Sequence, residues 1–94
     1  MNIEDARSIV QDQLATLRGQ GYEELLQLLD NTVGVELSRR SGSTYNLEIL
    51  AIWDDEPNHD LRVIVAIDED SVQRFISPLI DDFIIRPDGS FVGE

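Results

Sequence analysis

The sequence predicts an α+β domain in which two N-terminal helices pack on one face of a four- or five-stranded antiparallel sheet. Up to residue 30, apolar residues recur every three to four positions, which is the period of an α-helix. From residue 33 onward they alternate with polar residues, the period of a half-buried strand. Helices followed by consecutive strands favour an antiparallel sheet. A chain of 94 residues is expected to form a single domain, residues 1–94.

The first helix is predicted over residues 3–18. Asn2 is suited to cap its start, and Gly19 is expected to end it in a left-handed conformation. The spacing places these apolar residues on one face: Ile3, Ala6, Val10, Leu14 and Leu17. A second, shorter helix is predicted over residues 22–30. Its apolar side comprises Tyr22, Leu25, Leu26 and Leu29.

Three predicted strands follow, over residues 33–38, 45–53 and 61–67. A turn at residues 39–43 separates the first two. The later half of the second strand is apolar on both faces, which is typical of a central strand. The helical and alternating patterns predict that the core includes Leu14, Leu47, Ile49, Val63 and Val65.

The last quarter of the chain allows two interpretations. Residues 69–77 have helical apolar spacing, but Pro78 would end such a helix early, so a hairpin strand is the alternative. Residues 83–85 are predicted to form a short strand. The Arg86-Pro87-Asp88-Gly89 sequence is strong turn chemistry, so a C-terminal hairpin through residues 91–92 is expected.

The charge balance is extreme. The chain carries 19 acidic residues against 7 basic ones, all arginine, for a net charge of −12. A small soluble domain usually has a net charge of magnitude about 2–8. A surface this acidic repels nucleic acid and anionic membranes and attracts basic partners or cations. Nucleic-acid and membrane binding are therefore not expected.

The composition also bears on location. The acidic N-terminus lacks the basic start and long apolar run of a signal peptide, and no stretch is apolar enough to span a bilayer. The absence of cysteine excludes disulfides and thiolate chemistry. The sequence predicts a cytoplasmic protein.

His59 is the only histidine and lies in a polar loop around Pro57. A general base needs an orienting partner and a substrate pocket, and the sequence identifies neither. The adjacent carboxylates Asp81 and Asp82 would point to opposite faces of a strand. No catalytic residue is assigned.

The alternation of acids from Asp54 to Asp60 is similar to a calcium-binding loop. An EF-hand needs Gly at position six and Glu at position twelve, where this chain has His59 and Val65. Pooling these acids with residues 68–70 is unfavourable, because antiparallel pairing places the two segments at opposite ends of their strands. No metal ligand or cofactor is expected.

The segment from Trp53 to Asp60 predicts a binding patch. An aromatic ring beside several acids suits a lysine- or arginine-rich surface. The candidate partner-binding residues are Trp53, Asp54, Asp55, Glu56, His59 and Asp60. The favoured function is therefore a non-catalytic acidic protein that binds a basic protein partner, of the inhibitor, immunity or nucleic-acid-mimic type. A small carboxylate/histidine enzyme and a divalent-cation-dependent binding module remain as alternatives.

Several short segments resemble a family of small acidic bacterial proteins of uncharacterised function. The most distinctive is the C-terminal Pro87-Asp88-Gly89-Ser90-Phe91-Val92-Gly93-Glu94 sequence, followed by Ile52-Trp53-Asp54-Asp55 and Leu61-Arg62-Val63. In that family the segment matching residues 68–74 tends to be rich in glycine, which favours a hairpin there. This chain differs, with Glu69-Asp70-Ser71. The resemblance implies no activity, cofactor or catalytic residue.

Overall fold

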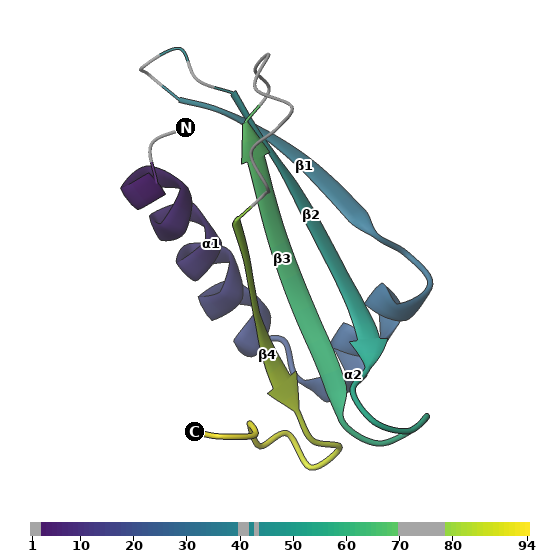
Figure 1. Ribbon diagram of the computed structural model, residues 1–94. Coiled ribbons are helices and arrows are strands. Elements are labelled where there is room, and N and C mark those ends of the chain that lie inside the picture. Colours follow the sequence, from purple (N-terminus) through teal and green to yellow (C-terminus); the bar gives the residue numbers. More distant parts are fainter. Residues whose placement is uncertain (1–2, 40–41, 43, 70–78) are drawn as a thin grey trace.

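The computed structural model describes residues 3–39, 42, 44–69 and 79–94, and it has an α+β fold (Figure 1). Two N-terminal helices precede a four-stranded antiparallel sheet. The elements are helices α1 (Ile3–Arg18) and α2 (Tyr22–Leu25), the 3₁₀ helix η1 (Leu26–Leu29), and strands β1 (Val33–Ser38), β2 (Thr44–Trp53), β3 (Leu61–Glu69) and β4 (Leu79–Ile85).

The four strands lie in sequence order, β1-β2-β3-β4, and every neighbouring pair is antiparallel. The central position predicted for the second strand is confirmed, since β2 lies between β1 and β3. Trp53 pairs with Leu61, and Asn46 with Asp68, so the two acidic segments do lie at opposite ends of β2 and β3. Because side chains alternate along a strand, the sheet has two chemically different faces.

Apart from the exposed Val33, the odd-numbered apolar residues of the strands face the hydrophobic core. They form one cluster with the buried side of α1, and α1 contacts β3 and β4 while η1 contacts β2. All five predicted core residues are at most 6% exposed, so that prediction is confirmed. The buried residues are Ala6, Ile9, Val10, Leu14, Leu17, Leu25, Tyr45, Leu47, Ile49, Ala51, Leu61, Val63, Val65, Ile67, Phe83 and Ile85.

The even-numbered side chains form what we call the outer face of the sheet. They are half-buried or exposed, and Ile52 and Ile80 are 46% and 58% exposed. The apolar members are Leu50, Ile52, Ile64, Ala66, Ile80 and Ile84. The charged members are Glu36, Glu48, Arg62, Asp68 and Asp82.

Two expectations for the helical region are wrong. Gly19 does not have a positive φ; the glycine that does is Gly21, with φ 84° and ψ 164°, and it directly precedes α2. The single helix expected over residues 22–30 is instead one turn of α-helix, α2, followed by the 3₁₀ helix η1. A segment this short is shaped by the sheet it packs against more than by its own propensity.

The C-terminal part departs from the expectation in two ways. β4 begins at Leu79, earlier than the predicted start at residue 83. Asp81 and Asp82 fall inside this strand and, as predicted, point to opposite faces: Asp81 accepts a hydrogen bond from Gln11 of α1 and Asp82 one from Arg62. The alternative structures proposed for residues 69–77 lie almost entirely outside the described residues.

The predicted C-terminal turn is present. The N–H of Gly89 donates to the carbonyl oxygen of Arg86 at 2.9 Å, and Gly89 has φ 90°, which favours glycine. Beyond the turn, Phe91 pairs with Ile85 only as an isolated bridge. Within the described residues the sheet therefore has four strands, and residues 91–92 add no fifth one.

Candidate functional site in the loop between β2 and β3

The loop of residues 54–60 connects β2 to β3 and is closed by its own backbone. The N–H of Asp54 donates to the carbonyl oxygen of Asp60 at 2.9 Å. Asn58 has φ 66°, a left-handed conformation that asparagine tolerates better than most residues. The hydroxyl of Tyr22, at the start of α2, donates to the carbonyl oxygen of His59 at 2.6 Å. The loop is thus tied to itself and to the helical layer.

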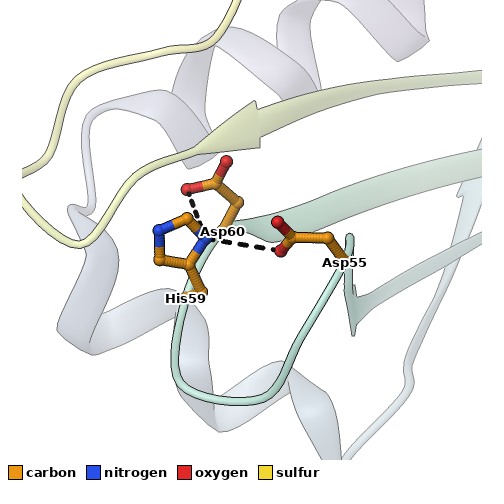
Figure 2. A group of neighbouring side chains, drawn as sticks. All are labelled: Asp55, His59 and Asp60. Atoms are coloured by element: carbon orange, nitrogen blue, oxygen red, sulfur yellow. Dashed lines mark hydrogen bonds and ion pairs between the residues drawn. The ribbon is translucent and has the colours of Figure 1, made fainter.

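This closure brings His59 between two carboxylates, as Figure 2 shows. Its Nδ1 atom lies 3.4 Å from Oδ1 of Asp55 and 3.5 Å from Oδ1 of Asp60. The imidazole and the Asp55 carboxylate are about half exposed, whereas the Asp60 side chain is only 16% exposed. The two carboxylates therefore place negative charge next to this nitrogen.

The cluster shifts the titration of its members. The hydrogen bond to Asp55, and then the charge of Asp60, raise the pKa of His59 above its ordinary value. The backbone N–H of Glu56 donates to Asp55 at 2.7 Å, and this bond, followed by the contact with His59, lowers the pKa of Asp55. Both shifts favour a positive charge facing the two carboxylates.

One atom of the cluster lacks a normal partner. Oδ1 of Asp60 is fully enclosed and accepts no hydrogen bond from the described residues. Its contact with Nδ1 of His59 at 3.5 Å has the length of an ion pair and not of a good hydrogen bond. Enclosed carboxylate oxygens are normally hydrogen-bonded or paired with a cation.

Asp54 belongs to a second charged cluster on the outer face. The Arg62 guanidinium donates to Oδ1 of Asp54 at 2.7 Å and to Oδ2 of Asp82 at 2.7 Å. It therefore links the loop to β3 and β4. The charge of Asp54 is already paired inside the molecule, while Glu56 lies exposed in the loop.

The structure places the six candidate partner-binding residues in four different settings. Asp55, His59 and Asp60 converge in one cluster. Asp54 turns toward Arg62, and Glu56 is exposed. Trp53 occupies a core-facing position and packs, partly buried, against the hydrophobic cluster.

The sequence does not identify three residues that contact the loop or its charged side chains: Tyr22, Arg62 and Asp82. Tyr22 was assigned only to the apolar side of a helix, and its hydroxyl reaches a residue 37 positions away. Arg62 and Asp82 lie on the same face of neighbouring strands. The contact between their side chains depends on the register between β3 and β4, which the sequence alone does not specify.

The chain was compared with protein-family models, curated proteins and solved structures, and none of them matches it. No helix among the described residues is long and apolar enough to cross a membrane.

Proposed function

We propose that this chain is a non-catalytic binding protein whose partner is a basic protein. The observation that carries the proposal is the outer face of the sheet, where exposed isoleucines lie among carboxylates. Among the described residues, α1 and η1 pack on the core face of the sheet and no helix covers the outer face, which offers a broad surface to a partner. A contiguous apolar patch with a polar rim is the usual anatomy of a protein interface.

The apolar part of this surface is contiguous because of the strand register. Leu50 of β2 pairs with Ile64 of β3, and Ala66 pairs with Ile80 of β4. Directly opposed side chains on neighbouring strands lie within contact distance. Ile80, on the edge strand β4, is the most exposed of the large apolar side chains among the described residues. The patch thus spans three strands.

The charged rim favours a basic partner. Glu48 and Asp68 border a shallow hollow of about 410 Å³, whose lining among the described residues also includes Asn46 and Ala66. A lysine or arginine side chain entering this hollow would meet two carboxylates that form no ion pair with the described residues. Such complementary charges speed association and select the partner.

The same charges oppose pairing of the outer face with a second copy of itself. Among the described residues this surface carries one positive charge, from Arg62, against five negative charges, from Glu36, Glu48, Asp54, Asp68 and Asp82. Two copies placed face to face would bring like charges together, in a chain whose net charge is −12. A partner with an apolar centre and a lysine- or arginine-rich rim fits this surface better.

One loop candidate, Asp54, borders the same surface, because Arg62 joins it to the outer face. The exposed Glu56 lies two residues further along the loop. Asp54 therefore contributes to the rim of the proposed interface. The half-buried Trp53 supports the loop from the core side.

The test uses charge-matched variants. The wild-type chain is immobilised to capture partners from host extract, and a captured protein is purified for binding kinetics. The double variant Glu48→Gln/Asp68→Asn removes two charges from the outer face, whereas Asp12→Asn/Glu23→Gln removes two exposed charges from the helices. We expect slower association only for the first variant. Equal effects of both variants, or an acidic captured partner, would contradict the proposal.

A further inference from the structure

We propose that Asp55, His59 and Asp60 form a binding site for a zinc-class divalent cation, held by one imidazole nitrogen and two carboxylate oxygens. One ligand atom from each residue lies within 4.8 Å of the others. The site is separate from the outer face. It does not depend on the proposed basic partner.

The spacing of the atoms suits tetrahedral coordination. Zinc binds nitrogen and carboxylate oxygen at about 2.0–2.2 Å, so two tetrahedral ligands are held about 3.4 Å apart. Nδ1 of His59 lies 3.4 Å and 3.5 Å from the two carboxylate oxygens. The loop therefore already holds the imidazole nitrogen at that separation from each carboxylate, and one ligand atom from each of the three residues lies within 4.8 Å of the others.

A second observation points to a cation at this position. Oδ1 of Asp60 is fully enclosed, faces the imidazole, and accepts no hydrogen bond from the described residues. An enclosed anionic oxygen is unfavourable unless a positive charge or a hydrogen-bond donor faces it. A metal ion seated between this oxygen and His59 supplies that charge.

The donor set selects the class of metal. Calcium takes six to eight oxygen ligands, and magnesium keeps oxygen ligands in octahedral geometry. Imidazole nitrogen with carboxylate oxygen suits zinc and its first-row neighbours. The carboxylates of Asp55 and Asp60 together balance a doubly charged ion. The half-exposed Asp55 and His59 leave room for water as a fourth ligand.

The main chain around the site is held from two directions. The Tyr22 hydroxyl binds the carbonyl of His59, and the N–H of Asp54 binds the carbonyl of Asp60. These bonds restrain the backbone of two proposed ligands. Ligands restrained in this way lose less conformational entropy when a metal binds.

The chain is first freed of metal by a chelator and dialysed. It is then titrated with cobalt(II), which serves as a spectroscopic probe. Binding is followed by visible absorption, whose intensity distinguishes tetrahedral from octahedral cobalt. Zinc(II) is then added to displace the cobalt, with excess magnesium present throughout. The variants are His59→Ala, Asp60→Asn and Asp55→Asn. Glu56→Gln is the matched control, because it removes a charge from the same loop outside the ligand set.

We expect one cobalt ion per chain with a tetrahedral spectrum, displaced by zinc. Loss of a residue that merely supports a ligand already weakens metal binding about 10–100-fold, so each ligand variant should lose at least about tenfold. Glu56→Gln should bind like the wild type. Urea unfolding in metal-free buffer confirms that each variant is folded. If one ligand variant fails to fold, the remaining two decide the result.

Three outcomes would overturn the proposal. The first is the absence of saturable binding by the wild type. The second is a purely octahedral spectrum, which would indicate diffuse attraction of the ion to an acidic surface. The third is equal weakening by His59→Ala and Glu56→Gln, which would assign the effect to charge and not to coordination.

Discussion

The hydroxyl of Tyr22 donates a hydrogen bond of 2.6 Å to the carbonyl oxygen of His59, joining the start of α2 to the β2–β3 loop. This contact spans 37 positions of sequence. It connects the helical layer to the loop in which the candidate side chains converge. The arrangement of this loop therefore depends on how the second helical segment docks.

Removing this bond should loosen the loop. We expect Tyr22→Phe to lower the free energy of unfolding by about 1 kcal/mol, the usual net contribution of one hydrogen bond. Amide hydrogen exchange in residues 58–60 should become faster, because their backbone loses its external anchor. Urea unfolding and exchange measured by NMR check both effects. Unchanged exchange in the loop would show that the bond does not restrain it.

The core prediction is tested at the centre of the sheet. Leu47 is 1% exposed and lies on β2, between two other strands. Leu47→Ala should cost about 2–5 kcal/mol, because it leaves a cavity in a packed core. Leu50→Ala, on the outer face of the same strand, is the control and should cost less. Urea midpoints compare the two, and a larger effect at Leu50 would contradict the assignment of faces.

The pH dependence follows from His59. Its pKa is raised in the folded state, so the contact with Asp55 and Asp60 stabilises the fold fully below the unfolded pKa. This contribution is lost as the pH rises through the higher, folded-state pKa. In metal-free buffer with a chelator, thermal stability should fall from about pH 6 to about pH 8, around the ordinary histidine pKa. His59→Asn should show a smaller fall, and an equal fall would exclude His59 as its cause.

The net charge of −12 should make the folded chain sensitive to salt. At 0.1 M salt, charges interact over a Debye length of about 10 Å, and more salt shortens this range. We expect sodium chloride, raised to a few tenths molar, to increase the melting temperature by weakening repulsion among the 19 acids. Thermal melts at increasing salt decide this. A flat or falling curve would show that screening of internal ion pairs dominates.

Arg62 should stabilise the outer face through its two carboxylate partners. Arg62 lies on β3, and its two terminal guanidinium nitrogens are each 2.7 Å from a carboxylate oxygen, one of Asp54 and one of Asp82. We expect Arg62→Met, which keeps an apolar stem, to cost about 1 kcal/mol, the upper end for exposed pairs. In a double-mutant cycle with Asp82→Asn, the two substitutions together should destabilise the fold by less than the sum of their separate effects. This difference, the coupling energy, should shrink as salt is added. A coupling of zero would show that the pair contributes nothing to stability.

The sequence by itself determined the fold class, the first helix and the central strands. Alternation along β2 and β3 could be detected because one face of each strand is buried along most of its length, which imposes a period of two. The start of β4 was not recognised, because Asp81 and Asp82 are unfavourable in strands and obscure the alternation. Their side chains accept hydrogen bonds from Gln11 on α1 and Arg62 on β3.

The tertiary structure alone decided which side chains meet. The sequence placed Asp55, His59 and Asp60 in one loop, but adjacency does not make side chains converge. Convergence required closure of the loop by its backbone and by Tyr22. The pairing of Arg62 with Asp82 likewise depends on the register of β3 against β4. Contacts between distant residues arise from packing and register, which periodicity along the chain does not specify.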